Sequence, residues 1–349
     1  MGMKKVLLLL CLVLFAALVM ESLYIFNKGF FFNFVGKKEP QPKPLLVYTF
    51  ENLKKTKFPN SRITVGRVVS ENSNSVSRMF YYSVPKTPNS KIMEKVSGLM
   101  NIPKEAGKYP VIVMFRGFVP DDIYKPGVET QPSAQVFAGQ GFITLAPDFL
   151  GYGESAKASS DPFENRFQTY TTALALLASI PNLNNGLQTD YLGTISADLN
   201  KIGLWGHSNG GQIGLSVLEL SGIKYPTVLW APVSTSFPYS VLYYTDESDD
   251  QGKALRQLFA NFEKTYDTDQ FSLTNYYSWI KAPIEINQGT ADQEVPVWWS
   301  DNLVTVLKKN NVSTEYFTYP GADHNLLPSG WSDAVLNSAD FYNQQFSKL

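Results

Sequence analysis

Cysteine and histidine are scarce in this sequence, which limits the chemistry that its sites can perform. The 349 residues include one cysteine, Cys11, and two histidines, His207 and His324. One cysteine cannot form a disulfide within the chain, and so few sulfur and imidazole ligands cannot build the common zinc sites. A glycine-rich loop of the kind that cradles phosphate is also absent. We therefore expect neither a metal nor a cofactor.

An excess of charge of either sign is missing as well. Lys and Arg number 30 against 31 Asp and Glu, which gives a net charge of −1. Binding to nucleic acid would require a basic surface, so this class of partner is excluded. A hydrophobic content of 44% over this length is enough for one large core, and we expect a single folded domain.

The first 26 residues differ in composition from the rest. Lys4 and Lys5 precede an uncharged run over residues 6–20, Glu21 follows, and a second apolar patch covers 23–26. This pattern predicts a signal anchor in the membrane over residues 1–26, with the remaining chain outside the cytoplasm, because positive charges before an apolar run stay in the cytoplasm. Cleavage of the segment, giving a secreted protein, is the alternative. The Pro- and Lys-rich stretch that follows predicts a linker over residues 27–60.

Residues 61–349 alternate strand-forming runs with helical patterns. The segments 62–69 and 77–82 predict an edge hairpin, and later strands are followed by helices. Such alternation is typical of a mostly parallel sheet with helices on both faces. We expect an α/β fold with eight strands.

One of these strands leads directly into a glycine-flanked serine. The apolar run 202–205 continues into Gly206-His207-Ser208-Asn209-Gly210, and a helical pattern follows up to Leu220. A serine at a tight strand-to-helix turn has a strained backbone, and side chains two residues away on either side would collide with the neighbouring strand and helix. The amide end of the helix also favours negative charge at the hydroxyl. The pattern predicts that Ser208 is a nucleophile.

A serine nucleophile needs a base, and the scarcity of histidine decides which residue supplies it. An imidazole accepts the serine proton at neutral pH better than any other side chain. His207 is adjacent to Ser208, and we expect its side chain to point away from the hydroxyl. His324 follows a strand and precedes the last helix. We therefore predict that His324 is the general base, with a polar loop residue as the alternative interpretation.

The base needs a carboxylate that fixes its tautomer. In hydrolases with this turn, the acid lies between serine and histidine in sequence, on a loop after a strand. Asp292 follows the apolar strand 283–288 and fits that order. Glu294 lies further along the same loop, and Asp323 is adjacent to the histidine, from where the far ring nitrogen is difficult to reach. We predict Asp292, with the other two as alternatives.

The negative oxygen of a tetrahedral intermediate requires two backbone amides. One is the amide that follows the nucleophile, which belongs to Asn209. The other comes from the loop after the strand 111–115, which continues into Arg116-Gly117-Phe118. We predict an oxyanion hole formed by the amides of Asn209 and Phe118, with a core aromatic as the alternative role of Phe118.

These residues resemble the α/β-hydrolase superfamily, and within it the catalytic domain of the prolyl oligopeptidase family, including its dipeptidyl aminopeptidase-like and acylaminoacyl peptidase-like members. The likeness rests on residues 95–113, on residues 141–155, on the turn around Ser208, and on 289–292 paired with His324. It implies an α/β-hydrolase fold with a Ser208, Asp292 and His324 triad. Tyr152 is a candidate substrate contact or a structural loop residue.

The sequence departs from that family at two points. Arg116 stands where these hydrolases usually have histidine, which puts the shape of the oxyanion loop in question. The family's β-propeller is not expected, because neither its length nor its repeat precedes Tyr109. Instead, residues 233–282 form the expected lid, helical at 254–266, with aromatic residues that either roof the site or only pack the lid onto the sheet. Its acidic run 246–250 either attracts a substrate amine or is solvated surface.

Together these features predict a serine hydrolase that forms an acyl-enzyme and resembles the serine-type peptidases of the prolyl oligopeptidase family. The expected substrate is a small-molecule ester or a short peptide. A carboxylesterase or lipase-like esterase on the same fold is the alternative. An acyltransferase and a non-catalytic binding module are further alternatives, and the presence of all three triad residues argues against the last.

Overall fold

The computed structural model describes residues 2, 18–24, 42–245 and 249–349. They divide into two compact units, Met1–Pro44 and Leu45–Leu349. In the first unit, residues 18–24 are helical. Within the described residues, every helix is too short or too polar to cross a membrane. The predicted anchor over residues 1–26 lies mostly outside the described residues.

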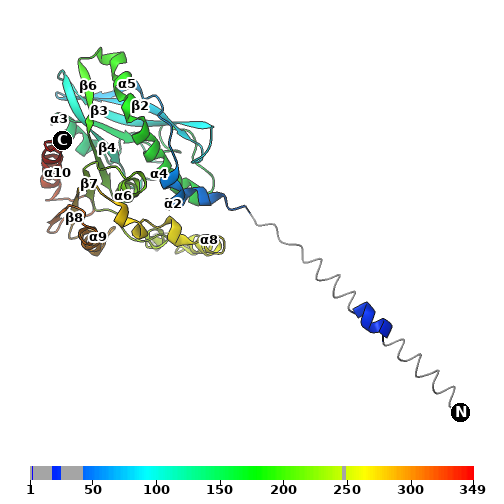
Figure 1. The fold of residues 1–349 in the computed structure, drawn as a ribbon. Helices are drawn as coiled ribbons and strands as arrows, with labels where there is room; N and C mark the ends of the chain where they lie inside the picture. Colours follow the sequence, from blue (N-terminus) through cyan, green and yellow to red (C-terminus); the bar gives the residue numbers. More distant parts are fainter. Residues whose placement is uncertain (1, 3–17, 25–41, 246–248) are drawn as a thin grey trace. The chain divides into compact units, whose positions relative to one another are not determined.

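Nine strands of the described residues form one sheet in the second unit (Figure 1). Their spatial order is β1-β2-β3-β5-β4-β6-β7-β8-β9. In this spatial order, the pairs β1-β2, β2-β3 and β3-β5 are antiparallel. The remaining pairs, from β5-β4 to β8-β9, are parallel. The strands are β1 (Thr64–Glu71), β2 (Ser75–Pro85), β3 (Met93–Pro103), β4 (Gly107–Phe115), β5 (Ile143–Pro147), β6 (Ile195–His207), β7 (Thr227–Trp230), β8 (Ile284–Gly289) and β9 (Thr314–Tyr319).

The sheet therefore has one strand more than the eight predicted. The sequence analysis predicted no separate strand over the residues of β3. A bend at residues 104–106 separates β3 from β4, and β5 lies between them in the sheet. The predicted edge hairpin is confirmed, because β1 and β2 pair antiparallel.

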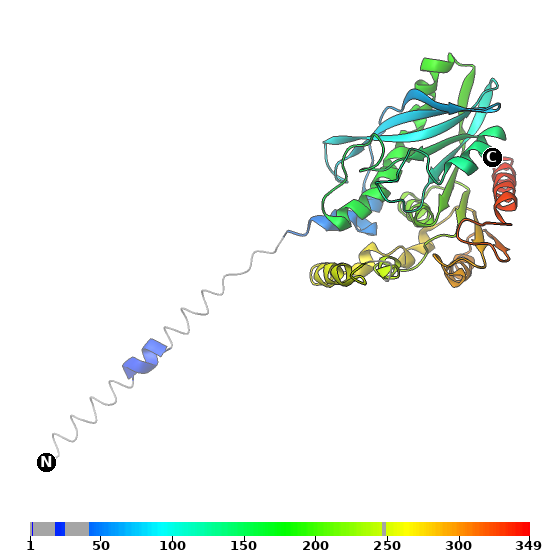
Figure 2. The same cartoon turned by 180° about the vertical axis from the view of Figure 1, so that it is seen from behind.

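Helices cover both faces of the sheet, as Figures 1 and 2 show from opposite sides. Residues of α3 and α10 share one core cluster with β4 and β6, and residues of α4, α5, α6 and α9 share the other. The helices are η1 (Pro44–Tyr48), α2 (Phe50–Lys55), α3 (Gln131–Gly139), α4 (Pro162–Ser179), η2 (Ile180–Asn182), α5 (Leu183–Tyr191), α6 (Asn209–Ser221), α7 (Tyr239–Leu242), α8 (Lys253–Glu263), η4 (Thr268–Phe271), η5 (Leu273–Asn275), η6 (Tyr277–Trp279), α9 (Val297–Lys309) and α10 (Trp331–Phe346).

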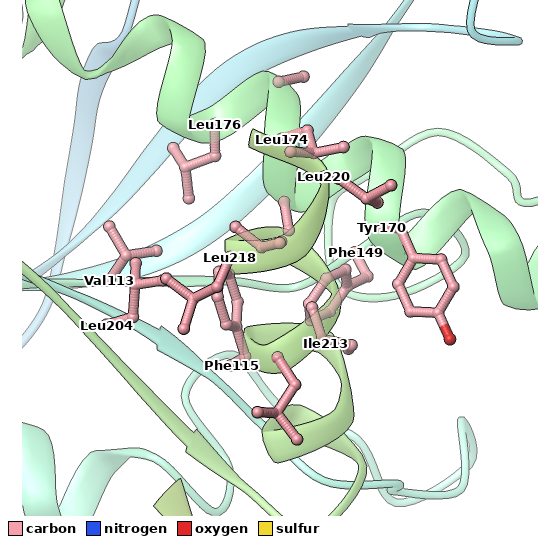
Figure 3. Packing of buried hydrophobic residues seen from close by; sticks show 14 of the residues in the cluster. Val113, Phe115, Phe149, Tyr170, Leu174, Leu176, Leu204, Ile213, Leu218 and Leu220 are labelled. Carbon is pink, nitrogen blue, oxygen red and sulfur yellow. The ribbon is translucent and has the colours of Figure 1, made fainter. Parts of the chain in front are cut away.

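The larger core fixes the position of α6. Figure 3 shows Ile213 and Leu218 of this helix among Val113 and Phe115 of β4 and Leu204 of β6. All five side chains are buried, and each contributes about 1.5–3 kcal/mol by leaving water. This packing holds the amino terminus of α6, which follows Ser208, rigidly against the end of β6.

Residues 45–55, which the sequence analysis placed in the linker, are part of the folded domain. They form η1 and α2, and Tyr48, Phe50 and Leu53 are buried. Tyr48 donates a hydrogen bond to Glu164 Oε1 at 3.0 Å, and Phe50 stacks on Tyr276 with 4.8 Å between the ring centroids. The linker prediction was wrong here, because the apolar side chains between the lysines have a surface to pack on.

The predicted lid connects β7 to β8. Its helix α8 confirms the helical pattern, but its aromatic residues Phe237, Phe259 and Phe262 are buried. They contact Phe163 and Phe167 of α4, with ring centroids 4.4–5.7 Å apart. These aromatic residues therefore pack the insertion onto α4.

The acidic run of the insertion lies only partly within the described residues. Asp250 accepts hydrogen bonds from the amides of Gly252 and Ala254 at 2.8 Å each. Residues 246–248 lie outside the described residues. Asp250 thus satisfies the first amides of α8, which is the usual role of an aspartate before a helix.

Glu285, the second residue of β8, is buried, and its titration predicts how stability depends on pH. Burial is the main cause that raises its pKa from an ordinary value of 4.5 to about 7. Because the folded state holds this proton more tightly than the unfolded chain, the free energy of unfolding falls as pH rises from about 4.5 through 7, by about 3 kcal/mol. We expect Glu285→Gln to remove this decline, since glutamine keeps the acceptor for Asn287 Nδ2 and Ser338 Oγ.

Urea unfolding of wild type and variant at pH 5 and pH 8 measures this effect. The two proteins should differ little at pH 5, and the variant should be more stable at pH 8. Glu105→Gln, at an exposed position, is the control and should follow the wild type. A wild type whose stability rises between pH 5 and 8 as much as that of Glu285→Gln would contradict the prediction.

Candidate active site

The turn between β6 and α6 has the geometry that the sequence predicts. Ser208 lies in a strained conformation with φ 56° and ψ −122°. A Cβ atom at Gly206 would collide with the carbonyl oxygen of Gly210, and one at Gly210 with the carbonyl oxygen of Phe115. Only glycine fits at these two positions, so β4, β6 and α6 approach closely enough to place the Ser208 side chain at the mouth of a cavity.

His324 and Asp292 meet on neighbouring loops at the carboxyl ends of β9 and β8. The Nδ1 atom of His324 lies 2.9 Å from Asp292 Oδ2. Asp292 also accepts hydrogen bonds from Gln288 Nε2 at 3.0 Å and from the amides of Glu294 and Val295 at 2.9 and 2.8 Å. Burial alone would raise the pKa of Asp292, but these hydrogen bonds and the charge of His324 outweigh it and hold the pKa below its ordinary value. Asp292 is therefore an ionised acceptor that orients the ring.

The two alternative acids have other positions. Glu294 lies on the opposite side of the ring, with Oε2 3.6 Å from His324 Nε2, and its side chain is 64% exposed. Asp323 accepts hydrogen bonds from the amides of Asn325 and Leu327 at 2.8 and 2.9 Å, and so closes its own loop. Neither of these carboxylates makes a hydrogen bond to Nδ1 within the part of the chain that the structure describes.

Ser208 and His324 line the same cavity of about 770 Å³, together with Phe118, Asn209 and Glu294. Within the described residues, Ser208 Oγ forms no hydrogen bond, and Nε2 of His324 faces Glu294. Hydrogen bonds between a nucleophile and its base are often long without substrate and shorten when substrate binds. The structure brings the predicted nucleophile and base to one surface.

The amides of Asn209 and Phe118 also lie at this cavity. Neither N–H donates a hydrogen bond to another described residue, which leaves both available to a ligand. The Phe118 side chain is 74% exposed, so the alternative role as a core aromatic was wrong. The preceding amide, that of Gly117, is not available, because it donates to Glu129 Oε2.

Glu129 and the buried His207 form a pair that the sequence analysis missed. Nδ1 of His207 lies 2.9 Å from Glu129 Oε1, and Nε2 lies 3.0 Å from the carbonyl oxygen of His324. With Glu129 ionised both partners accept, so both ring nitrogens can donate, which favours the positively charged form of the ring. Burial opposes this charge, but the hydrogen bond and charge of Glu129 outweigh it and raise the pKa of His207. The pair connects the ends of β4 and β6 to the loop that carries His324.

Arg116, the residue that departs from the family pattern, holds the loop after β4 in place. Its Nη1 donates to the carbonyl oxygen of Gly117 at 2.8 Å and its Nη2 to that of Asp148 at 3.3 Å. Its guanidinium carbon lies 4.1 Å from the ring centroid of Tyr152, whose hydroxyl donates to the Val119 carbonyl oxygen at 3.0 Å. Tyr152 thus has a structural role, and its ring also lines a second cavity, of about 210 Å³.

Comparisons with known proteins agree with this architecture. A model of the prolyl oligopeptidase family matches residues 189–348, and a chlorophyllase model matches residues 72–229. No curated protein matches the sequence. The predicted resemblance to the prolyl oligopeptidase family is therefore confirmed over the segment that contains Ser208, Asp292 and His324.

Solved structures with similar folds are esterases and other hydrolases. Acetyl xylan esterase 1 from Thermoanaerobacterium sp. is 15% identical, with 87% of this chain and 96% of that chain covered and a TM-score of 0.52. An acetyl xylan esterase from Paenibacillus sp. R4 is 17% identical, with 87% and 96% covered and a TM-score of 0.53. A putative hydrolase from Legionella pneumophila is 17% identical, with 85% and 95% covered and a TM-score of 0.54. These likenesses establish the predicted α/β-hydrolase fold.

Proposed function

We propose that this chain, a serine hydrolase of the α/β-hydrolase fold, works through an acyl-enzyme on Ser208, with His324 as base and Asp292 as the residue that orients it. One observation carries the proposal: the Asp292–His324 hydrogen bond of 2.9 Å lies beside a cavity that Ser208 also lines. The strained turn at Ser208 and the two available amides support it.

The reaction proceeds in two steps. Ser208 Oγ attacks the acyl carbon of the substrate while His324 Nε2 takes the hydroxyl proton, and the negative oxygen binds the amides of Asn209 and Phe118. His324 then donates the proton to the leaving group, and the bond between the acyl carbon and that group breaks. In the second step, His324 removes a proton from water, the hydroxide attacks the acyl carbon, and the proton returns to Ser208 as the acid leaves.

Peptide cleavage is the first candidate for this chemistry, and ester cleavage is the second. The match to the prolyl oligopeptidase family covers all three residues of the proposed triad. The chlorophyllase match instead covers the segment with Phe118 and Ser208, and both bonds are open to attack by the same acyl-enzyme mechanism.

Aminoacyl p-nitroanilides and p-nitrophenyl acyl esters distinguish the two candidates. An anilide nitrogen must be protonated as it leaves, whereas p-nitrophenolate leaves without a proton, so only the anilides demand the full acid role of His324. We expect purified full-length protein to hydrolyse both series, measured as kcat/KM. Hydrolysis of esters alone would favour the carboxylesterase, and hydrolysis of neither would contradict the proposed function.

A further inference from the structure

The two cavities beside Ser208 meet at the proposed oxyanion amides. Phe118, Arg166 and Asn209 line both the cavity of about 770 Å³ and the cavity of about 210 Å³. Ser208 and His324 line the larger one. A substrate whose carbonyl oxygen binds the amides of Asn209 and Phe118 can therefore extend from the acyl carbon in two directions.

The position of the base decides which part of the substrate enters which cavity. If the proposed function holds, His324 must donate a proton to the leaving group, so the leaving group lies on the side of His324, in the larger cavity. The acyl group then extends the other way, into the smaller cavity. This assignment rests on the proposed mechanism.

The smaller cavity has a marked imbalance of charge. Its lining includes Arg116 and Arg166 and no acidic residue, whereas the larger one is lined by Arg166 together with Glu129 and Glu294. The charge of Arg116 is opposed by the buried carboxylate of Asp148, which accepts a hydrogen bond from the Tyr124 hydroxyl at 2.6 Å. Arg116 is also engaged with two carbonyl oxygens. Arg166 is thus the cation that remains for a ligand.

Arg166 is held in place without an acidic partner. Its Nη2 donates to Gln212 Oε1 at 2.8 Å, and Gln212 in turn donates to the Tyr170 hydroxyl at 3.1 Å. Its Nε is buried and has no hydrogen-bond partner, and no described carboxylate forms an ion pair with it.

The acidic residues nearest in sequence to Arg166 are occupied elsewhere. Asp161 accepts hydrogen bonds from the first amides of α4 at 2.9 Å. Glu164 accepts from Tyr48 and from Ser159 at 3.0 and 2.5 Å. A cation in a cavity, fixed by a neutral amide and without a counter-charge, is the arrangement that recognises an anion.

We propose that the smaller cavity is an acyl subsite for substrates whose acyl group carries a carboxylate, and that Arg166 determines this preference. In the larger cavity, which Arg166 also lines, the charge of Glu294 disfavours a carboxylate, whereas Glu129 is paired with His207. The rings of Phe149, Tyr152 and Tyr170 line the smaller cavity and contact the apolar part of the acyl group. An N-acylated glutamyl group is one acyl group of this class.

Two substrates of equal size test the proposal, the α-benzyl esters of N-acetylglutamate and N-acetylglutamine, with hydrolysis followed by chromatography. We expect the full-length wild type to prefer the glutamate ester by about 10- to 100-fold in kcat/KM, because a charge-assisted hydrogen bond replaces a neutral one. Arg166→Gln should bring the ratio close to one, chiefly by slowing the glutamate ester, and Arg166→Lys should keep part of the preference. Arg62→Gln, at an exposed position, should leave the ratio unchanged.

Fluorophosphonate labelling of Ser208, run in parallel, separates the two levels of the hypothesis. If the wild type is labelled but hydrolyses the glutamate ester no faster than the glutamine ester, the acyl subsite is refuted and the proposed function stands. If Arg166→Gln slows both esters equally, Arg166 has only a structural role and the proposal is likewise overturned. If the wild type is not labelled and hydrolyses neither ester, the proposed function itself fails.

Discussion

Ser208→Ala is expected to lower kcat/KM by about 10⁵- to 10⁶-fold, because no acyl-enzyme can form and only the oxyanion amides and substrate binding continue to accelerate the reaction. The substitution removes one oxygen atom and keeps Cβ in the same strained turn, so folding should be unaffected. The measurement is the hydrolysis of the best p-nitrophenyl ester, together with covalent labelling by a fluorophosphonate probe.

A matched control exists on the same helix. Ser221 ends α6, and its hydroxyl donates to the Val217 carbonyl oxygen at 2.5 Å, away from both cavities. Ser221→Ala should be labelled like the wild type, while Ser208→Ala should not be labelled. Labelling that persists in Ser208→Ala would assign the nucleophile to another residue.

Asp292→Asn is expected to lower kcat by about 10⁴-fold with little change in KM, the magnitude seen when the orienting aspartate of a catalytic triad is replaced by asparagine. The amide nitrogen of asparagine can donate to Nδ1 of His324, which moves the ring proton to Nε2. A ring in that tautomer cannot accept the proton of Ser208. Steady-state kinetics with an unfolding curve for each variant distinguishes this effect from a loss of structure.

The alternative acids provide the controls for Asp292. Glu294→Gln and Asp323→Asn should each change kcat by less than about 10-fold, because an exposed carboxylate near a ring contributes little and Asp323 serves its own loop. A loss of activity in either variant larger than that in Asp292→Asn would transfer the orienting role to that residue.

The parts of the site that the sequence could predict are those fixed by local backbone geometry or by elimination. The requirement for glycine at 206 and 210 follows from the turn itself, and the choice of His324 as the proposed base follows from the presence of only two histidines. The loops after parallel strands lie at one edge of a sheet, so Asp292 and His324 could be expected to meet there. The structure places their side chains within hydrogen-bond distance.

Other features depend on contacts that no local pattern records. Glu129 reaches the site from the loop before α3, and Arg166 from the side of α4, so neither belongs to a motif of the strand ends. The strand β3 was not predicted, and β5 lies between β3 and β4 in the sheet although only a bend of three residues separates these two strands in sequence. The burial of Phe50 and Leu53 was not predicted, because the lysines around them are typical of a linker.

The aromatic contacts between the insertion and α4 determine how substrate can enter. Lifting the insertion away from α4 would return Phe237, Phe259 and Phe262 to water, at a cost of about 1.5–3 kcal/mol for each ring. Even the lower value, summed over the three rings, limits the fraction of molecules with a detached insertion to roughly one in a thousand. We therefore expect the insertion to remain packed on α4 during turnover. Substrate is expected to enter without movement of the insertion, which favours slender molecules over bulky ones.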